Sequence, residues 1–153
     1  MGPKTRAVAN WFILRGREKR TPVSLMKLQK LMYYAHGWAM AINDAPLLDE
    51  DVEAWDHGPV VFSVYKKADT FGSAPITSPI GDGLDIELSS DEVDVLEQVW
   101  DKYGALTAAQ LRAMTHEPGT PWSDHYMRGA HRKTIPDDSI RAWFVERYAI
   151  GVG

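Results

Sequence analysis

Histidines and carboxylates are the side chains of this sequence with the widest chemical range, because together they can bind zinc or iron. The chain contains five histidines: His36, His57, His116, His125 and His131. Two of them adjoin an acid, in His116-Glu117 and Asp124-His125, but neighbouring residues on a helix point to different faces. No His-Glu-x-x-His or other metal-binding spacing occurs. A structural role is therefore the favoured interpretation, and we predict no metal and no cofactor.

Other catalytic patterns are missing. The chain has no cysteine, which excludes thiol catalysis, disulfides and zinc–thiolate sites. Gly-x-Ser-x-Gly and the phosphate-binding Gly-rich loop are absent, and Gly81-Asp82-Gly83 lacks the strand and helix of a dinucleotide site. An acidic set can hold a cation, although a solvated loop is the simpler interpretation. The set is Asp49, Glu50, Asp51 and Glu53. We predict that the protein is not an enzyme.

Two basic clusters can meet phosphates or an acidic protein face. The first is Arg15, Arg17, Lys19 and Arg20, with Lys27 and Lys30 close in sequence, and the second is Arg128, His131, Arg132 and Lys133. The net charge is −4, with 17 Lys and Arg against 21 Asp and Glu, so general attraction to nucleic acid is not supported. No segment shows a clear DNA-recognition helix. Nucleic-acid binding stays an alternative, beside the simpler interpretation of solvated loops.

The chain has six tryptophans, which require large buried sites or large contact surfaces. Trp38, Trp100 and Trp143 lie on expected apolar helix faces and are predicted to be core. Trp55 and Trp122 lie beside turns, where an aromatic ring either locks a loop or anchors a partner. We expect the locking role for Trp55 and leave both roles open for Trp122.

Length and composition indicate one cytoplasmic domain. At 153 residues with 44% apolar residues, the chain can build a core without disulfides or metals. No apolar run approaches the roughly 18 residues of a membrane-spanning helix, and the stretch after the N-terminus is too short for a secretory signal. We therefore expect no membrane partner.

The elements that must position these residues are mainly helical: about six helices around a central helix over residues 22–42, plus a small two- or three-stranded sheet. Thr21 is predicted to cap the central helix, with Pro22 at its first position. A first helix over residues 6–15 is predicted to end at Gly16. Residues 52–55 are a candidate strand, and Gly58-Pro59 is predicted to open a helix ending at Gly72.

In the second half of the chain, capping residues and turn residues predict where the elements begin and end. Ser89 with Glu92, and Thr107 with Gln110, form capping boxes that start two helices. Short strands are predicted at Ile76 and at residues 84–88, and a helical turn at residues 122–127. A last helix over about residues 137–149 is predicted to be capped by Asp137 or Asp138. The expected inward residues of that helix are Ile140, Trp143, Phe144 and Tyr148.

A series of motifs resembles the Panacea domain, the family of SocA-like, phage-associated bacterial antitoxins. The motifs are Val8-Ala9-Asn10-Trp11-Phe12, then Leu25-Met26-Lys27-Leu28-Gln29-Lys30-Leu31-Met32-Tyr33-Tyr34-Ala35-His36-Gly37-Trp38, then Val52-Glu53-Ala54-Trp55-Asp56-His57-Gly58-Pro59-Val60-Val61 and Val64-Tyr65, then Thr115-His116 and Pro121-Trp122. The match runs from about residue 8 to 122, and the role of the chain after about Arg128 stays open.

The resemblance implies a protein-binding module without catalytic residues. It implies that the protein neutralises a cognate toxin by direct contact, and in the SocA-like mode presents that toxin to a AAA+ protease. An autoregulator that binds operon DNA is the alternative, and a metal-dependent enzyme built on His116 and His125 is less favoured.

The matched positions divide into candidates for partner binding and for structure. The partner-binding candidates are Lys27, Lys30, Tyr34, Trp55, Tyr65, His116 and Trp122. The structural candidates are Gln29, Tyr33, Glu53, Gly58, Pro59 and Pro121. Because Lys27, Lys30 and Tyr34 lie largely off the apolar stripe of the central helix, we expect them to form a basic and aromatic ridge beside it that suits protein contact. The alternative is that the lysine stems simply lie over the core.

Overall fold

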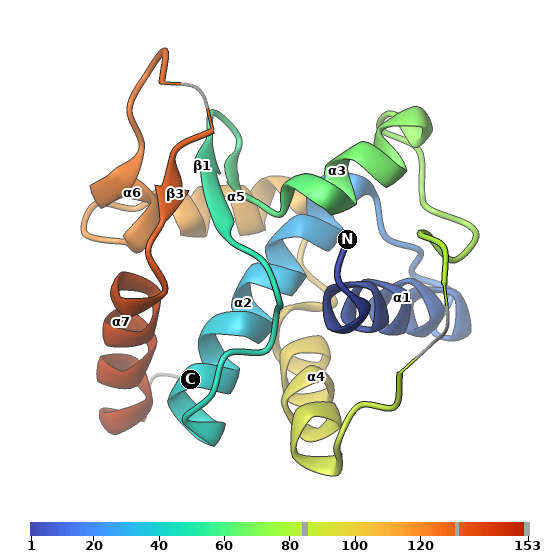
Figure 1. The fold of residues 1–153 in the computed structure, drawn as a ribbon, viewed down its shortest axis with the longest axis horizontal. Helices are drawn as coiled ribbons and strands as arrows, with labels where there is room; N and C mark the ends of the chain where they lie inside the picture. Colours follow the sequence, from blue (N-terminus) through green and yellow to red (C-terminus); the bar gives the residue numbers. More distant parts are fainter. Residues whose placement is uncertain (84–85, 131, 152–153) are drawn as a thin grey trace.

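Helix α2 (Leu25–Asn43) forms the axis of the molecule. A computed structural model describes residues 1–83, 86–130 and 132–151 of the chain. Helix α2 runs through its middle, with α7 on one side and α4 and α1 on the other (Figure 1). Every residue from Lys27 to Met40 is buried, because the neighbouring elements enclose α2 on all its faces. The predicted central helix is therefore confirmed.

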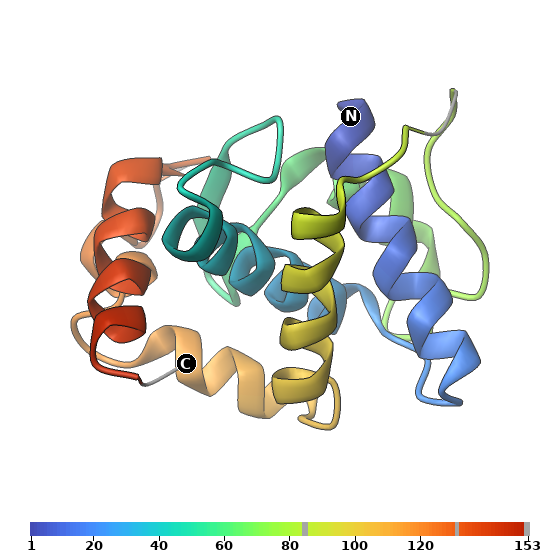
Figure 2. The same ribbon diagram turned by 90° about the horizontal axis from the view of Figure 1, so that it is seen from below.

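The other helices pack around α2 as the view from below also shows (Figure 2). The described residues form a mainly helical single domain with seven α-helices and one short 3-10 helix. The remaining helices are α1 (Pro3–Glu18), α3 (Phe62–Ala68), η1 (Asp69–Phe71), α4 (Ser90–Tyr103), α5 (Ala108–His116), α6 (Pro121–His125) and α7 (Asp137–Ala149).

The small sheet has three antiparallel strands in the order β2-β1-β3. Strand β1 (Val52–Trp55) is the predicted one, and β2 (Gly58–Val60) follows it through a tight hairpin. Strand β3 (Thr134–Ile135) pairs with the other edge of β1, with Val52 opposite Ile135. The sheet thus joins the hairpin to the segment that leads into α7.

Both capping boxes are confirmed. The hydroxyls of Ser89 and Thr107 accept hydrogen bonds from the N–H groups of Glu92 and Gln110, whose side chains accept the N–H groups of the capping residues in return. These signals were readable because they depend only on residues three positions apart.

Three predicted helix boundaries are wrong: the end of α1, the start of α2 and the start of α3. At Gly16 and Gly58 the glycine is needed for reasons other than a helix boundary. Helix α1 continues through Gly16 to Glu18, and Gly16 is small because a Cβ there would lie 2.9 Å from the carbonyl oxygen of Thr21. Helix α2 is capped by Ser24 rather than Thr21. Gly58-Pro59 belongs to β2, with Gly58 at φ 117°, and the next helix starts at Phe62.

The remaining differences lie in the second half of the chain. Pro136 caps α7, and Asp137 and Asp138 lie in its first turn. Ile140 and Phe144 are buried as expected, but Tyr148 is exposed. Ile76 forms no strand, although its N–H donates to the carbonyl of Val23 at 2.8 Å. Of the strand expected at residues 84–88, the first two positions lie outside the described residues and the rest is irregular.

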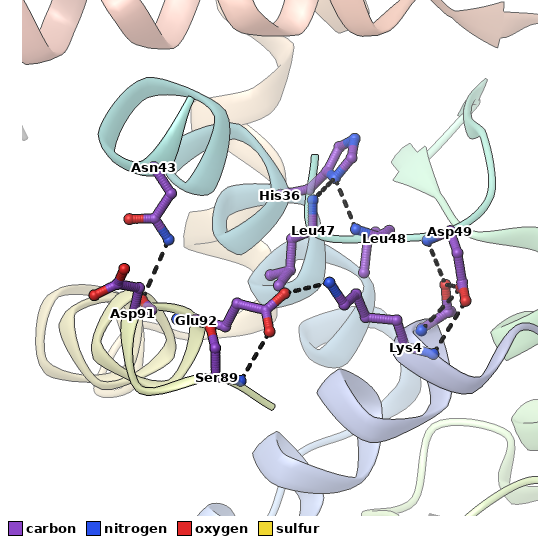
Figure 3. Close-up of polar contacts among 10 residues, drawn as sticks. Lys4, His36, Asn43, Leu47, Leu48, Asp49, Ser89, Asp91 and Glu92 are labelled. Atoms are coloured by element: carbon purple, nitrogen blue, oxygen red, sulfur yellow. Dashed lines mark hydrogen bonds and ion pairs between the residues drawn. The ribbon is translucent and has the colours of Figure 1, made fainter. Parts of the chain in front are cut away.

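A polar cluster ties the start of α1 to the loop after α2 (Figure 3). The Asp49 carboxylate accepts hydrogen bonds from the backbone N–H groups of Lys4 and Thr5, each at 3.0 Å. Burial alone would raise the pKa of Asp49, but the hydrogen bonds from the Thr5 hydroxyl and from these N–H groups outweigh it and lower the pKa. The Lys4 ammonium pairs with Glu92, which joins α1 to α4.

We expect Asp49→Ala to destabilise the protein by about 1–2 kcal/mol, because the first turn of α1 loses its acceptor. Since folding lowers the pKa of Asp49, its contribution is present above the unfolded pKa and is lost as the pH falls through the folded one. Urea unfolding at pH 7 and at pH 3 measures this difference. Asp51→Ala, which removes an exposed carboxylate nearby, serves as control. Equal stability of the two variants at pH 7 would show that Asp49 is not a cap.

Candidate functional site

A cavity of about 750 Å³ lies between the first half of α2 and the β1–β2 hairpin. Its volume is within the range of roughly 300–1,000 Å³ that is typical of ligand pockets. Residues far apart in the sequence line it, among them Met26, Gln29, Lys30, Trp55, Tyr65 and Arg132. We call this cavity the hairpin pocket.

Gln29 fixes the hairpin to α2. Its side-chain amide donates to the carbonyl of Val61 at 3.1 Å, and its carbonyl accepts the Val61 N–H at 2.8 Å. Both the backbone N–H and the backbone carbonyl of Val61 therefore have hydrogen-bond partners inside the protein, where an unpaired polar group would destabilise the fold. These two hydrogen bonds join helix α2 to the end of the hairpin.

Lys30 lies at the inner wall of the pocket and is only 1% exposed. Its ammonium donates to the carbonyl of Pro59 over a long 3.4 Å. A Cβ at position 58 would lie 2.6 Å from Cε of Lys30, which explains the glycine there. Burial, with a smaller contribution from the positive charge of Arg112, lowers the pKa of Lys30 to about 7.

An ion pair borders the pocket on the sheet side. The buried carboxylate of Glu53 accepts hydrogen bonds from Arg132 at 3.0 Å and from the indole of Trp55 at 2.9 Å. The guanidinium of Arg132 lies 3.6 Å from the ring centre of Phe62, and the ring of Tyr65 packs edge-on against Trp55. Glu53 thus holds both an arginine and an indole at the pocket.

Three stacked rings support the hairpin from the side of α5 and α6. The ring centre of His116 lies 3.7 Å from that of Trp122, and the ring centre of Tyr126 lies 4.6 Å from that of Trp122. The Trp122 indole donates to the carbonyl of Trp55 at 2.7 Å, so Trp122 has the locking role. Pro121 at the first position of α6 starts the helix that carries it. The Tyr126 hydroxyl donates to Asp56, and this hydrogen bond raises the pKa of Tyr126.

The ridge predicted on α2 is not exposed in the structure. Lys27, Lys30 and Tyr34 are all buried, because α4, α5 and the hairpin cover the faces that the apolar stripe leaves free. The Lys27 ammonium donates to the carbonyl of Gly104, and Tyr34 stacks on Tyr103 at 4.3 Å. Of these three residues, Lys30 lines the pocket and the other two do not.

The structure does not bring the histidines together. In the described part of the chain no three His, Asp or Glu side chains are placed to hold a metal ion, and His131 lies outside it. Both ring nitrogens of His116 face carbonyl oxygens, of Arg112 and Asp56, and His125 bonds the carbonyl of Pro121. Buried His36 accepts the N–H groups of Leu47 and Leu48 (Figure 3). His57 lines the pocket.

The basic clusters are also divided. Arg15 forms a two-pronged ion pair with Glu97, and Arg132 is committed to Glu53. Arg17 and Lys19 are exposed. The described helices include none that is long and apolar enough to cross a membrane.

Sequence reasoning missed three residues at the site: Phe62, Arg112 and Tyr126. The only available signal was the position of Phe62 directly after the Gly58-Pro59 motif. Tyr126 bonds Asp56 in the hairpin turn and the charge of Arg112 acts on Lys30, but both relations depend on tertiary packing, which residue spacing does not reveal.

Comparison with known proteins decides the family. Residues 28–123 match the family described as antitoxin SocA-like, Panacea domain. The chain belongs to this family. It is 35% identical over 126 residues to antitoxin SocA of Caulobacter vibrioides, a match that covers 76% of this chain and 67% of the relative. No solved structure matches the chain.

Membership in the SocA-like family supports an antitoxin role and suggests a regulator that is not an enzyme. The matched segment contains most of the hairpin pocket, including Lys30, Trp55 and Tyr65. Arg132 and helix α7 lie beyond the matched segment.

Proposed function

We propose that this SocA-like protein is an antitoxin that binds a cognate toxin protein directly and neutralises it, with the hairpin pocket as the contact site. The observation that supports the proposal is that residues from different parts of the family motif meet at the hairpin pocket. Gln29 and Lys30 come from one segment of the family motif and Trp55, Tyr65 and Trp122 from three others, and all five contribute to the pocket or to the hairpin that forms it.

The rim of the pocket suits contact with a protein. Met26 and Tyr65 are partly exposed there and add apolar and aromatic surface. Methionine and tyrosine are enriched in protein interfaces, and tyrosine provides a large contact area at low entropic cost. Gln29 and Trp122 hold the hairpin in place, so little ordering cost is expected when a partner binds.

Co-expression with the product of the neighbouring gene tests the proposal. That product is expected to inhibit growth alone and to be neutralised by this protein, and the two are expected to co-purify. Tyr65→Ala and Met26→Asp should weaken the complex by about tenfold or more, as hot-spot residues do. Tyr148→Ala, which removes an exposed aromatic ring on α7 outside the pocket, is the control. Growth inhibition that this protein does not relieve contradicts the proposal.

The fate of the toxin separates two modes of neutralisation. If the antitoxin presents its partner to a AAA+ protease, the half-life of the toxin shortens when the antitoxin is present. An unchanged half-life together with restored growth supports blocking by contact alone. Western blotting after translation arrest measures this directly.

A further inference from the structure

Lys30, at the inner wall of the hairpin pocket, has no carboxylate partner among the residues that the structure describes. Lys30 has three N–H donors, and one long hydrogen bond to the Pro59 carbonyl is the only contact they make within the described residues. Arg112 lies close enough to repel the charge of Lys30, and its Nε is buried without a hydrogen-bond partner. Neither cation has a carboxylate partner in the described ranges.

Such an arrangement is costly for folding alone. Buried charges in proteins are normally paired, because an isolated ion loses its hydration without compensation. The one buried carboxylate at the pocket, Glu53, is already occupied by Arg132 and Trp55. Asp56 also lines the pocket, but it is exposed and accepts the hydroxyl of Tyr126. Within the described residues the long bond to the Pro59 carbonyl is the one hydrogen bond of the Lys30 ammonium, so the pocket offers further donors to an occupant.

We propose that the hairpin pocket receives a carboxylate side chain, Asp or Glu, from a segment of the partner protein, and that this carboxylate pairs with Lys30. The inference rests on the proposed function and adds the chemistry that the pocket selects. A carboxylate would accept the unused donors of Lys30 and form a charge-assisted hydrogen bond in a site shielded from water.

The surroundings favour a protein segment as the source of the carboxylate. The acceptor lies at the end of a cavity whose rim is built from Met26, Tyr65 and Trp55, so the residues flanking the carboxylate would pack on apolar surface. Charge complementarity then fixes the register of the segment, and the apolar rim supplies contact area.

A pair of small probes tests the charge preference. Binding of 3-phenylpropionate and of its neutral amide, 3-phenylpropanamide, is measured by NMR through the indole N–H signals at pH 6.5. The carboxylate is expected to bind about tenfold tighter than the amide. The difference should vanish in Lys30→Met and persist in Lys66→Met, which removes an exposed lysine. Equal binding of the two probes, or no binding of the carboxylate at millimolar concentration, would overturn the inference.

A competition experiment tests the source. The purified neighbouring gene product is expected to displace 3-phenylpropionate from the pocket. Simultaneous binding of both would overturn the assignment to a protein carboxylate and indicate a small-molecule site. Neutralisation without any preference for the carboxylate probe leaves the antitoxin function intact and refutes only this inference. The preference without neutralisation refutes the proposed function instead.

Discussion

Replacing Lys30 with methionine is expected to stabilise the protein by about 2–4 kcal/mol at pH 7. Lys30 is almost fully buried, and burial lowers its pKa from the ordinary 10.5 to about 7. The folded protein therefore holds the lysine proton more weakly than the unfolded chain does. Methionine has a similar volume and no charge, so it fills the same space without the cost of burying an ammonium group.

The pH dependence of the free energy of unfolding tests directly whether the Lys30 ammonium group destabilises the fold. Between pH 7 and 10.5 the unfolded chain binds more protons at Lys30 than the folded protein, so stability rises with pH across this window. From pH 7 to pH 9.5 the rise is expected to be about 3 kcal/mol in the wild type. In Lys30→Met this part of the rise should be absent. Staying at or below pH 9.5 limits ionisation of Tyr33 and Tyr34 in the unfolded chain. Because burial raises their pKa values in the folded protein, that ionisation would lower the stability.

Urea unfolding at several pH values between 7 and 9.5 measures the effect. Lys66→Met, which removes an exposed lysine, should unfold with the same pH slope as the wild type. A Lys30→Met variant with an unchanged slope would show that Lys30 is not the group responsible. A variant less stable than the wild type at pH 7 would show that the ammonium group stabilises the fold.

The same substitution separates stability from function. A residue that destabilises the free protein persists in a sequence when it serves another purpose, and functional sites commonly carry such a cost. Lys30→Met is expected to combine higher stability with weaker binding of the partner. Loss of binding in a more stable protein cannot be attributed to misfolding.

How much of the fold the sequence predicted depends on the range of the interactions involved. The capping boxes at Ser89 and Thr107 were predictable because donor and acceptor lie only three positions apart in the sequence. Strand β1 and the central helix followed from hydrophobic patterning. Gly16 was misassigned as a helix end, because its small size serves the close approach of Thr21, five residues on.

The sequence predicted several residues of the candidate site but not where they lie in the fold. The motif named Lys30, Trp55, Tyr65 and Trp122, yet helical spacing placed Lys30 on a ridge beside the apolar stripe, whereas the structure buries it. An amphipathic pattern predicts one buried face, whereas α2 is enclosed on all faces. Arg112 remained invisible because its effect on Lys30 depends on the packing of α5 against the hairpin.

Phe144→Ala is expected to destabilise the protein by about 3–5 kcal/mol, the range for removing a large buried aromatic ring. Phe144 is fully buried on α7, and its ring lies 5.0 Å from that of Trp38 and 5.7 Å from that of Tyr33 on α2. The two helices meet at Gly37, where a Cβ would lie 2.2 Å from the Phe144 ring. The ring therefore fills the contact between α2 and α7.

The effect matters because α7 lies beyond residues 28–123, the segment that matches the SocA-like family. If α7 belongs to the folding unit, Phe144→Ala lowers the urea midpoint of the single unfolding transition. Val145→Ala, at a neighbouring position that is 39% exposed, should change the stability by no more than about 0.5 kcal/mol. Equal stability of the two variants would show that α7 is an appendage. A large loss for Phe144→Ala alone means that the antitoxin core needs this helix to cover α2, even though the family motif ends before it.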